Sequence, residues 1–487
     1  MKRILESCEP NTVLAYFEEL TKIPRESGHI KQVSDWLVAF AKKHALEYRQ
    51  DEAGNVIIKK PASPGYEKIK PVMIQGHMDM VAAKTKESTH DFAKDPLRLR
   101  VDGDRVFADG TTLGGDNGIA VACALALLAD PSACHPRLEC VFTADEEIGM
   151  LGAAAMDMSD LEAAYMINLD SDEEGIFTVS CAGGLRYNLF VPVQRETFSG
   201  TKAVLRVNGL LGGHSGTEIH KGRLNAGKEL IRILKELREN VPFRLEALFC
   251  GGQDNVIPSR GEAEIRIETE DEAKLEELAS GIGLKWTAEH RAAEPGISFE
   301  ILKAGRGREE CLTGESTLRV LDFLEALPNG VLAMSRDLPG LVQTSLNLGI
   351  LSLEPDRLLA AFSIRSSVEE EKQRTGRRLE KITQDFGGFF TSSGNYPGWR
   401  FEKDSAFREL AAETYRKLYG KEPVIEAIHA GLECGVFKAR MPGLQILALG
   451  PNLYDIHSPQ ESFSLSSVRR VWEFLRTLLA DMKAFSS

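Results

Sequence analysis

The chain has 487 residues, of which 43% are hydrophobic, and its 59 basic and 72 acidic side chains give a formal net charge of -13. This length exceeds what one hydrophobic core normally serves, so two domains are expected. The charges are spread along the chain without a long run of one sign, which argues against nucleic acid and membranes as partners.

The first residues do not have the pattern of a signal peptide. Acidic residues and a proline stand within Met1–Pro10, where a signal peptide needs its apolar stretch. No later run approaches the roughly 20 apolar residues of a membrane span. The eight cysteines are scattered, and several, such as Cys123 and Cys140, lie in apolar runs typical of reduced core thiols. We expect a soluble cytoplasmic protein.

Helix and strand patterns alternate over the first part of the chain. Apolar residues recur at helical spacing from Ile30 to Phe40, and a helix of small residues is expected at Ile119–Leu125. Short apolar runs typical of strands stand at Asn55–Ile58, Val72–Ile74, Leu138–Thr143 and Ala164–Leu169. This alternation predicts a doubly wound α/β arrangement, in which ligands bind beyond the carboxyl ends of the strands.

The pattern changes between about residues 186 and 394. Short stretches such as Ala203–Val207 and Glu262–Glu268 alternate apolar and polar side chains, as half-buried strands do. Amphipathic helices are expected between them, at about 223–238, 271–281, 315–327 and 369–384. The order of these elements predicts an inserted α+β domain built from two similar units.

The α/β pattern returns from about residue 395. A helix near 404–419, a strand at Gln445–Leu449, a loop carrying His457 and a final helix from about 466 are expected. The α/β domain would therefore consist of residues 1–185 and 395–487, with residues 186–394 inserted.

A histidine and an aspartate follow the apolar run Val72–Ile74. In extended backbone, residues two apart point the same way, so His77 and Asp79 can face one site. Proteins commonly orient a metal-binding imidazole with such a carboxylate. A surface loop is the alternative interpretation of this spacing by itself.

Further candidate ligands follow downstream. The full set in chain order is His77, Asp116, Glu147, Asp170 and His457. Two imidazoles and three carboxylates suit zinc or a similar borderline divalent ion. Three carboxylates leave one positive charge on two divalent ions, which a bridging hydroxide would cancel, so a two-metal hydrolase is predicted.

Two of these acids have informative neighbours. Asp116 is the expected bridge, because the glycines beside it give its backbone the freedom to approach both ions. Glu147 has Glu146 beside it, and one carboxylate of this pair can bind metal while the other stays free to take a proton from water and pass it to the leaving group.

Five motifs, in this order along almost the whole chain, resemble those of the M20 family of dinuclear zinc peptidases: His77–Asp79, Gly115–Gly118, Asp145–Gly149, Asn168–Asp170 and His457. Three further segments are most similar to the aminoacyl-histidine dipeptidase branch of that family: Ser180–Gly184, His429–Gly435 and Asp455–Pro459. The resemblance implies an α/β catalytic domain of the zinc-peptidase type, with a doubly wound mixed sheet and an inserted α+β lid domain.

The resemblance also implies a role for each ligand. His77 and Asp170 would hold one zinc ion, Glu147 and His457 the other, and Asp116 would bridge the two. Asp79 would orient His77, and Glu146 would be the general acid and base. Manganese and cobalt remain alternatives to zinc, because the ligand types permit all three.

Four residues are candidates for substrate binding, of which His214, Asn255 and Arg365 lie in the expected lid and Gly431 in the last part of the α/β domain. By resemblance, His214 polarises the scissile carbonyl, Asn255 contacts the same region and Gly431 offers a backbone contact to the substrate carboxylate. Arg365 could hold that carboxylate in a bidentate manner. A turn histidine at 214 and a solvated strand arginine at 365 are the alternatives.

The predicted function is metal-dependent hydrolysis of dipeptides, either of the Xaa-His type or with broad specificity. A zinc-bound hydroxide would attack a small peptide held between the domains, and Glu146 would protonate the departing amine. An aminoacylase or aminopeptidase of the same architecture is the alternative, and an inactive metal-bound binding protein is a remote one. The resemblance also allows a homodimer formed through the lid.

Overall fold

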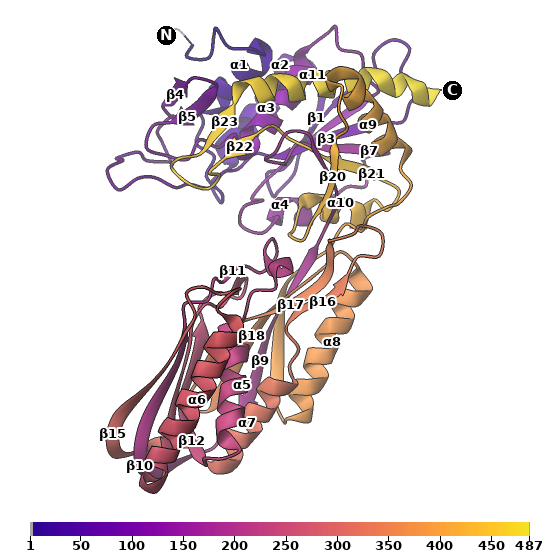
Figure 1. The fold of residues 1–487 in the computed structure, drawn as a ribbon. Helices are drawn as coiled ribbons and strands as arrows, with labels where there is room; N and C mark the ends of the chain where they lie inside the picture. The colour runs from indigo at the N-terminus through magenta and orange to yellow at the C-terminus, as the bar shows by residue number, and fades with distance from the viewer. Residues whose placement is uncertain (1–2, 487) are drawn as a thin grey trace. The chain divides into compact units, whose positions relative to one another are not determined.

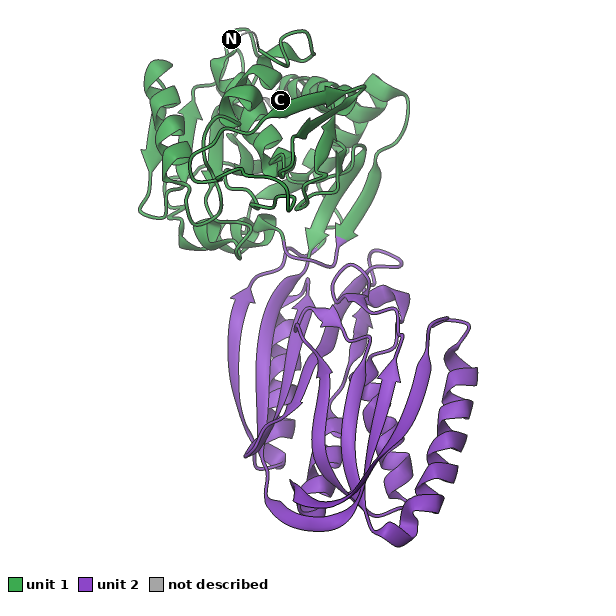
Figure 2. Ribbon diagram, turned by 90° about the vertical axis from the view of Figure 1, so that its left-hand side faces the viewer, with its two compact units in different colours: residues 1–181, 401–427, 432–487 green, residues 182–400, 428–431 purple. Residues whose placement is uncertain are grey.

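The structure is a computed structural model that describes residues 3–486 (Figure 1). The chain divides into two compact units (Figure 2). Unit 1 comprises residues 1–181, 401–427 and 432–487, and unit 2 comprises residues 182–400 and 428–431. The domain limits expected from the sequence remain a prediction, because compactness alone does not define a domain that folds or moves by itself.

Unit 1 is built on an eight-stranded mixed sheet. The strands, in spatial order, are β1 (Glu47–Gln50), β2 (Val56–Lys60), β6 (Leu138–Thr143), β3 (Val72–His77), β7 (Tyr165–Asn168), β21 (Gln445–Ala448), β8 (Ile176–Cys181) and β20 (Val424–Ile428). The central strand β3 runs parallel to β6 and β7, and β21 runs parallel to β7. Every residue of β3 and β6 is buried, as expected for strands covered on both faces.

The helices of unit 1 are α1 (Asn11–Leu20), α2 (Lys31–Lys43), α3 (Gly115–Ala129), α4 (Leu151–Ala155), α9 (Ala406–Tyr419), α10 (Glu433–Arg440) and α11 (Leu465–Asp481), followed by a short 3₁₀ turn, η3 (Met482–Ser486). α3 packs between α1 and β3, which is why its small apolar residues are buried almost all round. α9 and α10 pack on β21, which brings the last part of the chain onto the sheet formed by the first part. A small four-stranded sheet completes the unit, formed by β4 (Leu99–Asp102), β5 (Arg105–Ala108), β22 (Leu453–Tyr454) and β23 (Ser462–Ser464).

Unit 2 contains a nine-stranded antiparallel sheet. Its strands are β9 (Gly183–Pro192), β10 (Arg195–Asn208), β12 (Phe243–Gly251), β14 (Gly261–Ile267), β15 (Ser298–Leu312), β16 (Gly330–Met334), β17 (Val342–Leu353), β18 (Arg357–Ser366) and β19 (Phe389–Tyr396). Its helices α5 (Ala226–Arg238), α6 (Glu272–His290), α7 (Gly314–Ala326) and α8 (Glu369–Asp385) cover one face of the sheet (Figure 1). Apolar side chains of the helices and strands, such as Leu234 and Leu348, share one core. Two short 3₁₀ turns, η1 (Ile219–Lys221) and η2 (Thr269–Asp271), and a two-stranded ribbon of β11 (Gly213–His214) and β13 (Val256–Ile257) complete the unit.

The large sheet of unit 2 has two halves with the same strand order. β10, α5, β12, β14, α6 and β15 form one half, ordered β15-β10-β14-β12, and β9, α7, β17, β18, α8 and β19 form the other, ordered β19-β9-β18-β17. The halves join where β12 pairs with β17. The second half takes its first strand, β9, from before the whole first half, so its elements are not contiguous in sequence.

The α/β fold with a mixed sheet and an inserted α+β part, predicted from the sequence, is confirmed. The helix expected at 271–281 extends to His290, and strand β9 was not anticipated. Within residues 3–486, no helix is long and apolar enough to cross a membrane. All eight cysteines are free, and Cys123 and Cys140 are buried as expected.

Candidate metal centre

The carboxyl ends of three parallel strands meet at one edge of the sheet in unit 1. His77 is the last residue of β3 and pairs in register with Thr143, the last residue of β6. Gln75 pairs with Asn168, the last residue of β7. The segments that follow β6 and β7 carry Glu146, Glu147 and Asp170, so the sheet brings these acids close to His77.

Asp116 and His457 reach the same edge from other elements. Asp116 stands at the entry to α3 with extended backbone angles (φ −79°, ψ 107°), and Asn117 is also non-helical, so regular helical geometry begins at Gly118. His457 lies in the loop between β22 and β23 and has a positive φ of 62°. The five ligands predicted from the sequence are therefore supplied by five separate segments of the chain.

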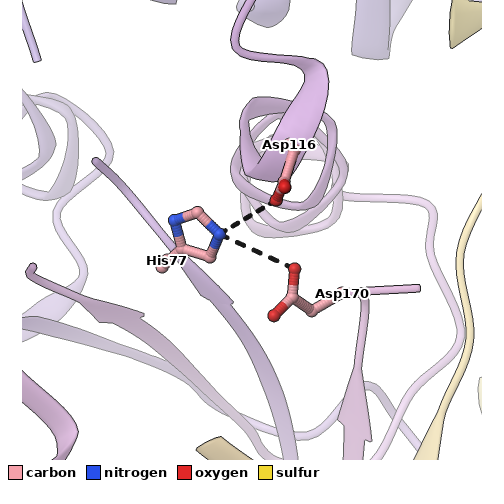
Figure 3. Close-up of side chains that lie close together, drawn as sticks. All are labelled: His77, Asp116 and Asp170. Carbon is pink, nitrogen blue, oxygen red and sulfur yellow. Dashed lines mark hydrogen bonds and ion pairs between the residues drawn. The ribbon is translucent and has the colours of Figure 1, made fainter. Parts of the chain in front are cut away.

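The carboxylate of Asp116 lies between the two histidines. Its Oδ1 is 3.0 Å from Nε2 of His77, and its Oδ2 is 3.1 Å from Nε2 of His457. Nε2 of His77 also lies 3.6 Å from Oδ1 of Asp170 (Figure 3). Nε2 of His457 lies 3.0 Å from Oε1 of Glu147.

Potential ligand atoms form two groups that share Asp116. Those of His77, Asp116 and Asp170 lie within 4.8 Å of one another, as do those of Asp116, Glu147 and His457. A third group within the same limit contains His77, Glu146 and Glu147. The two groups that share Asp116 have the composition predicted for a pair of bridged metal ions.

The cluster concentrates negative charge in a partly buried place. Burial raises the pKa of Asp170 well above its ordinary value, and the carboxylates of Asp116, Glu146 and Glu147 raise it further. Burial, together with Glu433, Glu147 and Asp116, raises the pKa of Glu146 to about 8. Such a cluster needs protons or cations to balance its charge. Imidazole and carboxylate donors in this ratio fit borderline divalent cations.

The two imidazoles respond to the same carboxylates. Burial disfavours the charged form of His77, but the carboxylates of Asp170, Asp116 and Asp79 raise its pKa well above the ordinary value. Hydrogen bonds with Asp116 and Glu147 raise the pKa of His457 to about 10. The carboxylates therefore favour the protonated form of both rings in the metal-free protein.

Asp79 contacts the far side of the His77 ring. Its Oδ1 lies 3.3 Å from Nδ1 of His77, and its carboxylate accepts hydrogen bonds from the Ser27 hydroxyl (2.8 Å) and the backbone N–H groups of Glu146 (3.1 Å) and Glu147 (3.3 Å). Burial opposes its charge, but the hydrogen bond and charge of His77 lower the pKa of Asp79 to about 2. Asp79 thus ties the His77 ring to the segment that carries the two glutamates.

A row of buried polar groups that sequence reasoning missed connects the ends of the three strands. Glu433 accepts hydrogen bonds from Nε2 of Gln75 (2.6 Å) and the hydroxyl of Thr143 (2.7 Å). Nδ2 of Asn168 donates to Oε1 of Gln75 (2.6 Å). Burial raises the pKa of Glu433 to about 7. The polar residues Gln75 and Asn168, which stand inside the apolar runs of β3 and β7, could have indicated these buried hydrogen bonds.

The candidate residues in unit 2 form their own cluster. Nη2 of Arg365, on β18, lies 3.4 Å from Nε2 of His214, and Nη1 donates to the hydroxyl of Tyr396 at 3.3 Å. Arg365 is only 7% exposed, so it is not the solvated arginine that the sequence also allowed. Burial and the charge of Arg365 lower the pKa of His214, which favours the neutral imidazole.

Two further candidates have structural contacts in this unit. The backbone carbonyl of Asn255 accepts the N–H of Ser215 at 2.9 Å, and Nδ2 of Asn347 holds the loop through the carbonyls of Asp254 (2.9 Å) and Val256 (2.8 Å). A Cβ at Gly431 would lie 2.8 Å from the ring of Tyr396. Gly431 therefore makes room for the Tyr396 ring, which sequence reasoning missed.

The chain belongs to peptidase family M20/M25/M40, whose model matches residues 73–481. It is 36% identical over 487 residues to the cytosol non-specific dipeptidase of Escherichia coli (strain K12), with 99% of each chain covered. Among solved structures, it is similar to the aminoacylhistidine dipeptidase from Vibrio alginolyticus, with a TM-score of 0.93 and 34% identity over 98% of this chain and 97% of that one. A Bacillus cereus aminopeptidase shares the fold, with a TM-score of 0.55 and 15% identity over 98% and 99% of the two chains. The family resemblance inferred from the motifs is confirmed.

The buried Glu433 makes stability depend on pH in the metal-free protein. Folding raises the pKa of Glu433 from 4.5 to about 7, so between these pH values the carboxyl group ionises more readily in the unfolded chain than in the folded one. As pH rises through this range, the free energy of unfolding of the wild-type protein should fall by up to ~3 kcal/mol relative to that of Glu433→Gln. Urea unfolding in a chelator at pH 5, 6, 7 and 8 measures this difference. Parallel pH dependences of the two proteins would contradict it.

Proposed function

We propose that this protein is a metal-dependent dipeptidase. The observation that carries the proposal is the position of Asp116, whose two oxygens face two separate histidines, each accompanied by a further carboxylate. The full-length similarity to two proteins named as dipeptidases supports it. His77 and Asp170 would hold one ion, Glu147 and His457 the other, and Asp116 would bridge them.

The donor set also bears on which metal the protein uses. Zinc fits two imidazoles and three carboxylates, and manganese and cobalt are the alternatives. Two such ions would polarise the scissile carbonyl and lower the pKa of a water molecule between them. We also propose a cytoplasmic location, in line with the name of the Escherichia coli relative. A homodimer remains a prediction, which the mass of the protein in solution tests.

Glu146 is the proposed general acid and base. Its backbone N–H is held by Asp79, and its side chain belongs to the group that contains His77 and Glu147. Cations at the site would bring the pKa of Glu146 down from about 8, so that its carboxylate can accept the proton of the attacking water. The same carboxyl group would then donate that proton to the departing amine.

Arg365 is the proposed anchor for the free carboxylate of a dipeptide. Its guanidinium is buried, and its Nε has no hydrogen-bond partner among the described residues, so it retains a donor for a ligand. A planar guanidinium matches a carboxylate in a bidentate manner. His214, which lies beside it and whose lowered pKa favours the neutral form, would donate a hydrogen bond to the carbonyl oxygen of the substrate.

A substrate panel tests the proposed function. Dipeptides should be hydrolysed far faster than tripeptides or N-acyl amino acids, and a dipeptide amide, which lacks the carboxylate that Arg365 would bind, should be a poor substrate. Initial rates with saturating zinc measure these preferences. Faster hydrolysis of N-acyl amino acids would favour an aminoacylase, and equal hydrolysis of the amide would remove the proposed role of Arg365.

Two substitutions separate chemistry from metal binding. Glu146→Gln should keep both metal ions while kcat falls by a factor on the order of 100 to 10,000, because the proton carrier is lost. Asp116→Asn should instead lose metal, because a neutral amide cannot bridge two cations. Metal content by elemental analysis and kcat measure both effects, with Glu162→Gln as a surface control. Near-normal turnover of Glu146→Gln, or a fully loaded Asp116→Asn protein, would contradict the assignments.

Tyr396→Phe tests how Arg365 is held. The variant keeps the ring beside Gly431 but removes the hydroxyl that lies 3.3 Å from Arg365. We expect KM for dipeptides to rise about threefold to tenfold, with kcat changed less than about twofold, because a hydrogen bond to a charged group is lost. Tyr187→Phe, which removes a hydroxyl bonded to Glu380 at 2.7 Å, is the matched control. Equal KM values for all three proteins would refute this role.

A further inference from the structure

Arg25 is a buried arginine whose hydrogen bonds go to backbone carbonyls. It is 2% exposed, and its Nη1 donates to the carbonyls of Met78 (3.0 Å) and Asp79 (2.9 Å). Its Nη2 donates to the carbonyl of Gly114. One guanidinium therefore joins the segment that follows His77 to the segment that precedes Asp116.

The glycines around Asp116 make room for this side chain. A Cβ at Gly114 would lie 2.2 Å from Nη2 of Arg25, and a Cβ at Gly118 would lie 2.8 Å from the same atom. Gly114 also has a positive φ of 65°, which favours glycine. The expected reason for these glycines was backbone freedom at Asp116, but at Gly118 the structural reason is the space that Arg25 occupies.

Glu461 accepts hydrogen bonds from the backbone N–H groups of the same segment. It is 2% exposed, and its Oε2 accepts the backbone N–H groups of Leu113 (2.8 Å) and Gly114 (2.9 Å). Its Oε1 accepts the N–H of Asp116 (3.2 Å). Glu461 stands four residues after His457 in the same loop, so it joins the segment of Asp116 to that of His457.

The two side chains hold one peptide segment between opposite charges. Gly114 gives its carbonyl to Arg25 and its N–H to Glu461. Burying two charges is costly, and apolar residues of similar volume usually pack at least as stably. General packing is therefore a poor explanation for this pair. A need to fix the direction of the Asp116 carboxylate explains it better.

We propose that Arg25 and Glu461 are positioning residues of the metal centre, which together fix the Leu113–Asp116 segment so that one oxygen of Asp116 faces His77 and the other faces His457. This inference rests on the proposed metal ligands. Because Asp116 would touch both ions, a shift of this segment would weaken both. Outer partners of metal ligands typically contribute about 10-fold to 100-fold in metal affinity.

The experiment compares two variants with two matched controls. Arg25→Lys keeps the charge but loses the planar fork, and Glu461→Gln keeps the volume but loses one acceptor oxygen. Glu139→Gln alters another buried carboxylate of unit 1, which accepts the backbone N–H groups of Glu162 and Ala163 (3.1 Å each). Arg266→Lys alters another buried arginine, which donates to the carbonyls of Gly200 (3.2 Å) and Gly307 (3.1 Å).

Zinc stoichiometry and affinity are measured by competition with a chromophoric chelator, and unfolding of the metal-free proteins is measured alongside. Wild-type protein should bind two zinc ions. Arg25→Lys and Glu461→Gln should bind both about 10-fold to 100-fold more weakly, while the controls stay within about threefold of wild type. The double variant should lose less than the product of the single losses, because both residues act on Gly114.

Three outcomes would overturn the inference. If both variants bind zinc as tightly as the wild-type protein, the inference is wrong but the proposed function is unaffected. Wild-type protein that binds no zinc pair would overturn the inference and the proposed metal centre together. A loss in the controls as large as in the variants would make the effect a general one of buried charge. If a variant does not fold, Glu461→Asp replaces it, which keeps the charge but moves the carboxylate oxygens away from the Leu113–Asp116 segment. Its zinc affinity must then fall by the same factor.

Discussion

The carboxylate of Asp116 is the contact on which the rest of the site depends. Its two oxygens lie 3.0 Å from His77 and 3.1 Å from His457, residues that are 380 positions apart in the chain. The first histidine ends the central strand of the sheet, and the second comes from a loop that the chain forms only after unit 2 is complete. One side chain thus joins the first and the last of the three segments of unit 1 at the place where metal ions are proposed to bind.

Such a cluster of acids is unfavourable by itself, and the surrounding contacts fix its geometry in spite of that cost. Asp79 holds His77 and the backbone of Glu146, and the row formed by Glu433, Gln75 and Asn168 connects the strand ends. These contacts fix the donors before any cation arrives. A site held in this way spends little binding free energy on ordering its ligands, which suits both tight metal binding and fast chemistry.

The sequence located the candidate ligands more readily than the residues that support them, for a physical reason. His77, Asp116 and Asp170 stand where strands end or helices begin, and the periodicity of apolar residues reveals those places. Arg25 and Glu461 bind backbone atoms of segments up to 348 positions away, and a sequence contains no signal for backbone positions. For the same reason the sequence did not predict β9, which belongs to the second half of the unit 2 sheet although it precedes the first half in the chain. It also did not predict that the Tyr396 ring occupies the space beside Gly431.

The central claim is that Asp116 bridges two metal ions, and anomalous diffraction from zinc-loaded crystals tests it most directly. The account predicts two zinc peaks about 3.5 to 4 Å apart, with one oxygen of Asp116 on each. His77 and Asp170 should complete one site, and Glu147 and His457 the other. A single zinc peak, or two peaks of which only one contacts Asp116, would contradict the account.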